Sequence, residues 1–173
     1  LQNNEFTGEI PPELGNLTNL TFLNLQFNHL SGEIPPEIGN LTNLTYLDLG
    51  YNDLSGEIPI EIGNLTNLNT LILRYNYLSG VIPEEICVGF IIPNVRGNNL
   101  CPPYPYCINS HDIDSQDTSD CDIGCYDETA CNYNPTAEYG DNSVCEYPIE
   151  ELTCYVDTNG DGIPDIVDTF YNS

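Results

Sequence analysis

Residues 16–39 read NLTNLTFLNLQFNHLSGEIPPEIG, and this unit recurs twice without gaps, at 40–63 and 64–87. The second copy matches the first at 18 of 24 positions. Residues 1–15 repeat the rear part of the unit, and residues 90–100 repeat its front part. A period of this length indicates stacked supersecondary units that share one continuous core. Residues 1–100 are therefore expected to form a solenoid.

Within each unit, a short run of alternating leucines should form a parallel strand with its leucines in the core. The expected core leucines are Leu23, Leu25, Leu47, Leu49, Leu71 and Leu73. An asparagine follows each strand, at Asn4, Asn28, Asn52, Asn76 and Asn98. A buried amide costs free energy unless it is hydrogen-bonded, so we expect a ladder of bonds to neighbouring backbone groups. The segment L-S-G-x-I-P is expected to turn the chain, because glycine relaxes φ and proline ends strand pairing.

These motifs resemble the plant-type leucine-rich repeat, L-x-x-L-x-L-x-x-N-x-L-S-G-x-I-P, over residues 1 to about 100. The resemblance implies an α/β-type solenoid with a short parallel β-sheet on its concave face and 3-10 helices or loops on its convex face. We expect one partial, three full and one partial capping repeat. Small disulfide-rich irregular modules should follow: a Cys-stapled cap at 101–123, a Cys-rich module at 124–150 and a calcium-loop segment at 151–173.

Differences between the repeats locate the surface that is free to specialise. Four of the six changes between the first two full units fall on outward-facing strand positions. Stacked strands lie about 4.8 Å apart, so equivalent positions form columns on the concave face. The predicted binding face contains two aromatic columns and the only two arginines of the chain: Phe22, Phe27, Tyr46, Tyr51, Arg74, Tyr75 and Arg96. The arginines fit either a ligand contact or pairing with the chain's own acids, and the aromatic residues fit either a binding platform or cross-strand packing.

The charge balance excludes several classes of partner. The chain has 27 acidic residues, two arginines and no lysine, which gives a formal net charge of −25. Nucleic acids and anionic membranes are bound through basic side chains, so neither is an expected partner. No apolar stretch approaches the roughly 20 residues of a membrane span. Because the sequence starts at Leu1 without a signal peptide, we expect a mature or truncated product.

Eight cysteines lie in the second half of the chain, at Cys87, Cys101, Cys107, Cys121, Cys125, Cys131, Cys145 and Cys154. An even number in loop-rich sequence favours disulfides and an extracellular, secreted protein. Their connectivity cannot be deduced from the sequence. The strings LCPPYPYC and QDTSDC resemble the C-terminal cap of secreted bacterial leucine-rich repeat proteins, which implies that the first four cysteines fasten a cover over the last repeat.

Two segments near the C-terminus offer oxygen ligands for Ca²⁺. Residues 157–168, DTNGDGIPDIVD, fit the twelve-residue calcium loop, with ligands from Asp157, Asn159, Asp161, Asp165 and Asp168 and the backbone carbonyl of Ile163. Aspartate replaces glutamate at position 12, and flanking helices are lacking, so the loop resembles the calcium repeats of extracellular proteins. Residues 124–147 resemble a small Cys module of secreted bacterial surface proteins. A second metal site there would use Asp127, Asn132, Asn134, Asp141 and Glu146, although these residues equally fit ordinary surface acids and turn formers.

Two non-enzymatic functions fit these features. Neither histidine has a nucleophile or a carboxylate partner at a recognisable spacing, so no enzymatic activity is expected. In the first function, the protein is structural and associates head to tail with itself through an open solenoid end at which Leu1, Phe6, Ile10 and Leu14 face water. In the alternative function, the concave face recognises a protein, peptide or glycan. The sequence favours the self-associating interpretation slightly.

Overall fold

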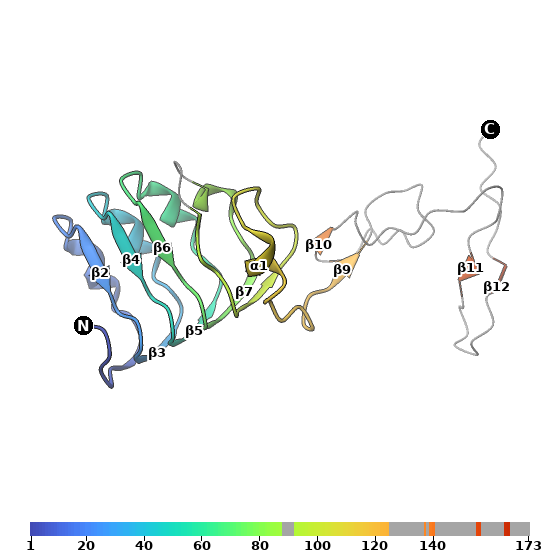
Figure 1. The fold of residues 1–173 in the computed structure, drawn as a ribbon, viewed down its shortest axis with the longest axis horizontal. Helices are drawn as coiled ribbons and strands as arrows, with labels where there is room; N and C mark the ends of the chain where they lie inside the picture. Colours follow the sequence, from blue (N-terminus) through green and yellow to red (C-terminus); the bar gives the residue numbers. More distant parts are fainter. Residues whose placement is uncertain (88–91, 125–136, 138, 141–154, 157–164, 167–173) are drawn as a thin grey trace. The chain divides into compact units, whose positions relative to one another are not determined.

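The computed structural model describes residues 1–87, 92–124, 137, 139–140, 155–156 and 165–166. The chain forms two compact units, Leu1–Cys121 and Asp122–Ser173. The first unit is a solenoid in which each 24-residue repeat makes one coil, and the coils stack in sequence order (Figure 1). The solenoid fold predicted from the repeat is confirmed.

Each of the three full repeats contributes one strand to each of two parallel sheets. The first sheet contains β2 (Phe22–Asn24), β4 (Tyr46–Asp48) and β6 (Thr70–Ile72), in that order. A bridge between Ile72 and Asn94 adds the next coil to this sheet. The register joins equivalent positions, for example Phe22 with Tyr46 and Tyr46 with Thr70. The columns predicted on the concave face therefore exist.

The second sheet was not predicted. It contains β1 (Thr7–Gly8), β3 (His29–Gly32), β5 (Asp53–Gly56), β7 (Tyr77–Val81) and β8 (Asn99–Cys101). We expected the L-S-G segment to be only a turn, but it pairs with the same segment of the neighbouring coils. Its glycines, such as Gly56 at φ 74°, take a backbone conformation that lets the chain leave the sheet at once.

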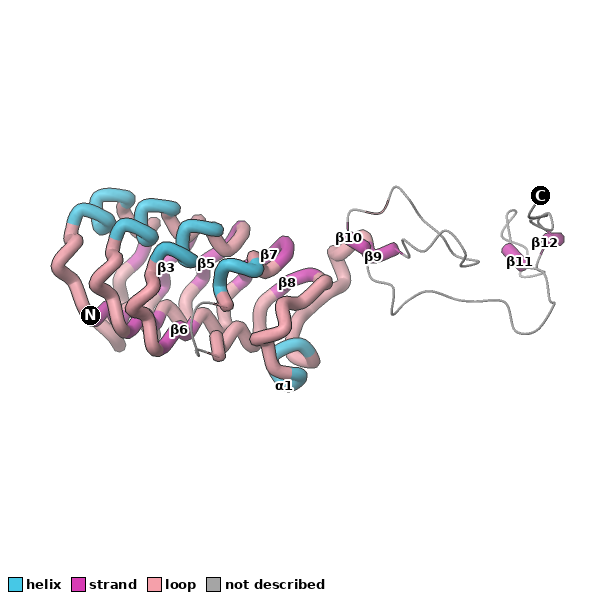
Figure 2. Tube along the Cα trace, turned by 90° about the horizontal axis from the view of Figure 1, so that it is seen from above, coloured by secondary structure: helices cyan, strands magenta, loops and turns pink. Residues whose placement is uncertain are grey.

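Short 3-10 helices form the side opposite the strands, as Figure 2 shows. They are η1 (Pro12–Asn16), η2 (Pro36–Asn40), η3 (Ile60–Asn64) and η4 (Glu84–Ile86). A proline immediately precedes each helix in an extended conformation, because its fixed φ suits a helix start and its missing N–H is not needed there. The core between helices and strands consists of stacked leucines and isoleucines, and all six predicted core leucines are buried in it.

The asparagine column forms the predicted ladder from Asn28 to Asn98, whereas Asn4 is exposed and donates to carbonyls of its own coil. In the middle coil, Asn52 Nδ2 donates to the carbonyls of Leu25 (3.1 Å) and Leu49 (3.0 Å), and its Oδ1 accepts from the Leu30 N–H (3.1 Å). Asn76 makes the equivalent bonds one coil further on. Each amide thus ties its own coil to the preceding one, which satisfies backbone groups that the core would otherwise leave unpaired.

Residues 101–121 close the solenoid after the last asparagine of the ladder. Gln116 Oε1 accepts from the Leu100 N–H (3.2 Å), and its Nε2 donates to the Val95 carbonyl (3.1 Å). These are the same two kinds of bond that Asn52 makes to the preceding coil. Ser115 Oγ accepts from the Gly97 N–H (3.1 Å), which satisfies another group of that last coil. A glutamine outside the repeat therefore takes the place of the next asparagine.

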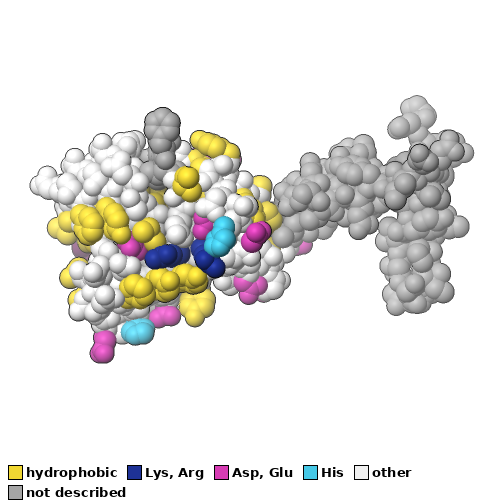
Figure 3. All heavy atoms as spheres, viewed as in Figure 1, with side chains coloured by type: hydrophobic (Ala, Val, Ile, Leu, Met, Phe, Trp, Pro, Cys, Tyr) yellow, Lys and Arg dark blue, Asp and Glu magenta, His cyan; other side chains and the backbone are white. Residues whose placement is uncertain are grey.

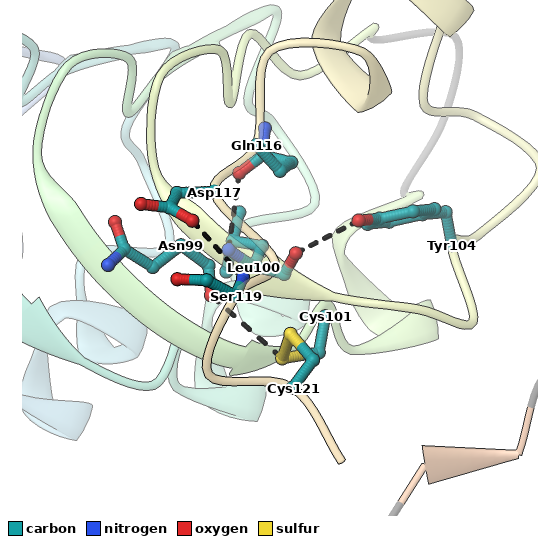
Figure 4. Close-up of a disulfide and its surroundings, with 8 residues drawn as sticks. All are labelled: Asn99, Leu100, Cys101, Tyr104, Gln116, Asp117, Ser119 and Cys121. Atoms are coloured by element: carbon teal, nitrogen blue, oxygen red, sulfur yellow. Dashed lines mark hydrogen bonds between the residues drawn. A yellow bond between two sulfur atoms is a disulfide. The ribbon is translucent and has the colours of Figure 1, made fainter. Parts of the chain in front are cut away.

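Two disulfides hold this cap on the end of the solenoid: Cys87–Cys107, and Cys101–Cys121, which Figure 4 shows. These are the four cysteines that the resemblance implied would fasten a cover, and the structure pairs them with one another. Asn109 caps the N-terminus of the short helix α1 (Ser110–Ile113), where its Oδ1 accepts from the Asp112 N–H (3.0 Å). Figure 4 also shows the Tyr104 hydroxyl, which donates to the Leu100 carbonyl (2.9 Å).

In the second unit, the structure describes four short strands. β9 (Ile123–Gly124) pairs in parallel with β10 (Tyr139–Gly140), and β11 (Tyr155–Val156) pairs antiparallel with β12 (Asp165–Ile166). The remaining four cysteines lie outside the described residues. Among the residues that are described, no helix is long and apolar enough to cross a bilayer.

Candidate functional site on the concave face

Two columns of stacked aromatic rings lie on the concave face. In the first column, Phe22 stacks on Tyr46 with ring centroids 4.4 Å apart. In the second, Phe27 stacks on Tyr51 at 4.4 Å and Tyr51 stacks on Tyr75 at 4.7 Å. The structure therefore brings all five predicted aromatic residues onto one face. Because the rings cover each other's faces, they leave mainly their edges for a ligand, which suits a polypeptide better than a sugar ring stacked face-on.

The second aromatic column is built on a strained backbone. Phe27, Tyr51 and Tyr75 have φ of 55°, 54° and 55°, a left-handed conformation that is uncommon for bulky residues. The same column begins with Asn3 and ends with Gly97, two residue types that adopt this conformation at low cost. Strain of this kind costs about 1–3 kcal/mol for each residue, and it concentrates at functional sites.

Both arginines lie on this aromatic column. The Arg74 guanidinium carbon is 5.2 Å from the centroid of the Tyr51 ring, and that of Arg96 is 5.9 Å from the Tyr75 ring. Figure 3 shows the two arginines next to each other, with hydrophobic side chains on both sides. Within the part of the chain that the structure describes, the one ion pair joins His29 to Asp53 at 3.7 Å, and neither arginine has a carboxylate partner. Pairing with the chain's own acids, one of the two alternatives, is not seen among these residues.

Three residues of this face were not among the predicted site residues: Asp48, Gly50 and Ile92. Asp48 is only 2% exposed, and its carboxylate accepts from the Gly50 N–H (3.0 Å) and from the Tyr46 hydroxyl (3.1 Å). Ile92 is exposed in the column of Phe22 and Tyr46. The sequence pointed to Asp48 and Gly50 only through their differences from the preceding repeat. What they do on this face is visible only from the positions of their side chains and neighbours.

Burial raises the pKa of the Tyr46 hydroxyl above its ordinary value of 10.0, and the charge and hydrogen bond of Asp48 raise it further. Both effects disfavour a phenolate, because the ionised form would lose solvation and face a carboxylate. The positive charge of Arg74 acts in the opposite direction and lowers this pKa, because it favours the phenolate.

The residues predicted at the open solenoid end differ in exposure. Leu1 and Phe6 are exposed, and Leu14 is half-buried. Ile10 was expected to face water, but it is 3% exposed, because it belongs to the same core cluster as Leu25 and Leu30. These side chains line an apolar pocket of about 280 Å³ together with Thr7 and Pro11.

The predicted calcium ligands cannot be placed. Asp157, Asn159, Asp161, Ile163 and Asp168 lie outside the described residues, and only the backbone of Asp165 is described, in β12. The second candidate site, with Asp127, Asn132, Asn134, Asp141 and Glu146, also lies outside them. In the described portion of the chain, no three His, Cys, Asp or Glu residues gather in a metal-binding cluster.

Comparison with protein-family models identifies the repeats. The model described as "Leucine Rich repeats (2 copies)" matches residues 18–59, and the model "Leucine Rich Repeat" matches residues 1–17 and 67–88. The first unit is therefore a leucine-rich-repeat solenoid. A search of curated proteins gave no match.

Solved structures with this fold include plant receptor ectodomains. A chain of the BIR3–SERK2 complex from Arabidopsis thaliana is 38% identical, with a TM-score of 0.56 over 62% of this chain and 58% of that chain. The LRR ectodomain of the Arabidopsis thaliana receptor kinase GASSHO1/SCHENGEN3, in complex with CASPARIAN STRIP INTEGRITY FACTOR 2, is 40% identical, with a TM-score of 0.53 over 56% of this chain and 12% of that chain. A plant ice-binding protein is 36% identical, with a TM-score of 0.55 over 58% of this chain and 33% of that chain. This chain thus spans less than two thirds of the length of each of these chains.

Proposed function

We propose that this chain is an extracellular, non-enzymatic interaction protein whose concave face binds an acidic segment of another protein. The observation that carries the proposal is the placement of the chain's only two basic side chains, Arg74 and Arg96, side by side on stacked tyrosines. Arginine and tyrosine are typical of binding hot spots. Guanidinium groups can form two parallel hydrogen bonds to a carboxylate.

The surroundings of the arginines support an acidic ligand. In a chain of net charge −25, neither arginine has an ion-pair partner among the described residues. The exposed hydrophobic side chains Phe22, Phe27, Tyr75 and Ile92 share this face, so a ligand can bury apolar area beside the charged contact. One related chain was solved in the BIR3–SERK2 complex and another in complex with CASPARIAN STRIP INTEGRITY FACTOR 2, which makes a polypeptide the favoured class of ligand.

The double variant Arg74→Ala, Arg96→Ala tests this function. The probe is a rhodamine-labelled peptide of alternating glutamate and phenylalanine, measured by fluorescence anisotropy at 0.15 M salt, where repulsion beyond about 8 Å is screened. We expect the native protein to bind this peptide and the variant to lose at least tenfold in affinity, since each charged hydrogen-bonded contact contributes roughly 1.5–3 kcal/mol. A peptide with lysine in place of glutamate is the matched control probe.

The same variant separates a binding role from a structural one. Loss of two exposed cation–π contacts should lower the free energy of unfolding by no more than about 2 kcal/mol. A loss of several kcal/mol with unchanged peptide binding would show that the arginines stabilise the fold, and it would contradict the proposed function.

Head-to-tail self-association is the second candidate function. The observation that favours it is the apolar pocket lined by Leu1, Phe6, Ile10 and Leu14, which could receive an apolar side chain of a second copy. The cap limits the geometry of such an assembly, because Gln116 already occupies the end of the asparagine ladder. A second copy would therefore have to bind this pocket through surface side chains rather than by continuing the ladder.

We also propose that residues 157–168 bind Ca²⁺ and stabilise the second unit. The alternating oxygen-bearing residues of this loop support the proposal. The pairing of β11 with β12 supports it too, because Val156 pairs with Asp165 and thus holds both ends of the intervening eight residues together. The site at Asp127, Asn132, Asn134, Asp141 and Glu146 remains a weaker proposal that rests on its residue types.

A further inference from the structure

Gly50 stands where the preceding coil has Gln26 and the next coil has Arg74. The backbone does not require glycine at this place, because Gly50 is not among the glycines with positive φ. Its neighbours explain it instead. A methyl group on Gly50 would lie 3.2 Å from the Arg74 carbonyl oxygen, 3.2 Å from Asp48 Oδ1 and 3.3 Å from Arg74 Cγ. The space beside Gly50 is thus taken by the Arg74 carbonyl, the Asp48 carboxylate and the stem of the Arg74 side chain.

This close packing determines where the guanidinium lies. With its stem against Gly50, Arg74 reaches the ring of the next residue, Tyr51, at 5.2 Å. The neighbouring coil provides an internal comparison. Arg96 has Arg74 rather than a glycine at the equivalent place in the preceding coil, and its guanidinium lies farther from Tyr75, at 5.9 Å. The closer cation–π contact is therefore made by Arg74, whose equivalent position in the preceding coil is a glycine without a side chain.

The position of Arg74 also limits how it can bind a ligand. Its Nε is buried and has no hydrogen-bond partner, while the residue as a whole is half-exposed. A carboxylate therefore has to approach the two terminal nitrogens rather than the side that includes Nε. A guanidinium that is already fixed loses less side-chain entropy when the ligand binds.

We propose that Gly50 is the positioning residue of the concave anion site: its missing side chain seats Arg74 on Tyr51 and presents the terminal guanidinium nitrogens to a ligand carboxylate. The predicted effect on ligand binding rests on the proposed function. The contact between Arg74 and the Tyr51 ring can be measured without any ligand. Gly50→Ala should displace Arg74 from the ring and leave the rest of the coil in place.

NMR of the arginine side chains tests the seating directly. The chain contains only two arginines, so its spectrum should show two Nε–H resonances, which Arg96→Lys assigns. In the native protein, we expect the Arg74 Nε–H to be shifted upfield by the Tyr51 ring and to exchange slowly with water. Gly50→Ala should remove both properties, and Gln26→Ala, one coil earlier in the same column, should leave them unchanged. Tyr51→Asn removes the ring itself and keeps a residue suited to positive φ. This variant should also abolish the upfield shift of the Arg74 Nε–H.

Peptide binding completes the test. Gly50→Ala should weaken the binding of the glutamate–phenylalanine peptide by about three- to tenfold, as loss of one preorganised cation–π contact predicts. An unchanged Arg74 resonance in a folded Gly50→Ala variant would overturn the inference. If Gly50→Ala fails to fold, an Arg74 resonance that is unaffected by Tyr51→Asn would overturn it instead. A native protein that shows the shifted resonance but binds no peptide would refute the proposed function alone.

Discussion

At the scale of single residues, the concave face combines an unfavourable backbone conformation with favourable contacts between aromatic side chains. Tyr51 has a positive φ, yet its ring stacks on Phe27 and Tyr75 and carries Arg74. Aromatic pairs contribute about 0.5–1.5 kcal/mol each beyond their burial, which is comparable to the cost of the backbone conformation. The aromatic column is therefore held in a conformation that a small or amide residue would adopt with less strain.

The raised pKa of Tyr46 predicts a stability change at alkaline pH. A group whose pKa is higher in the folded protein binds more protons there than in the unfolded chain, so its contribution to stability is present below pH 10.0 and is lost as the pH rises through the folded pKa. Urea denaturation between about pH 9 and 11.5 should therefore show a steeper loss of stability in the native protein than in Tyr46→Phe. Identical slopes for Tyr46→Phe and the native protein would contradict this assignment.

At the scale of structural elements, the asparagine ladder and the cap perform one task with different residues. Each asparagine joins two coils, and Gln116 makes the equivalent bonds for the last coil. Gln116 Nε2 also donates to the Asp112 carbonyl (2.7 Å), which connects α1 to the end of the ladder. The cap is thus joined to the solenoid by hydrogen bonds as well as by disulfides.

Gln116→Ala should destabilise the first unit by roughly 1–3 kcal/mol, because the Leu100 N–H loses its acceptor at the end of the solenoid. Gln116→Glu keeps this acceptor but loses the donor to Val95 and Asp112, so we expect it to be at least as destabilising. Thermal unfolding monitored by circular dichroism measures both variants, and native-like melting of the two would show that the cap is held by its disulfides alone.

The repeat made the coils, the buried leucines and the asparagine ladder predictable, because each register position recurs and its neighbours are copies of itself. Gln116 was not predictable, since it lies outside the repeat and acts through a longer side chain from another direction. The second sheet was missed because L-S-G reads as a turn in isolation, and its pairing depends on an identical segment in the next coil. The packing of Arg74 against Gly50 was not predictable from the sequence, because it depends on the path of one side chain between two coils.

At the scale of the whole molecule, the net charge of −25 opposes association, and calcium would reduce this repulsion. We predict that millimolar Ca²⁺ raises the melting temperature of the second unit relative to chelator, because a ligand that binds only the folded form stabilises it by mass action. The variant Asp157→Asn, Asp161→Asn should remove this increase, and Mg²⁺ should substitute poorly because it prefers a smaller octahedral site.

Sedimentation velocity of the same samples tests the self-association. The head-to-tail interpretation requires larger species at high protein concentration with calcium. Phe6→Glu should dissociate these oligomers, because it places a charge in the apolar pocket. Monomers at every concentration and calcium level would exclude this interpretation.

Gln116 takes the place of a further asparagine at the end of the ladder. The number of repeats is therefore independent of the residues that end the solenoid. Because the disulfides and hydrogen bonds described for this terminator (residues 101–121) reach back no further than Cys87 of the third full repeat, extra 24-residue units inserted before that repeat should join the stack without altering the terminator. Duplicating residues 40–63 would then add one more tyrosine to each ring column and one more glycine to the arginine column, which lengthens the inner surface by a single step. The same 21-residue terminator, grafted behind an unrelated series of such coils, should seal it equally well if the receiving coils supply one cysteine at the place of Cys87, because Cys101 and Cys121 both lie within the terminator.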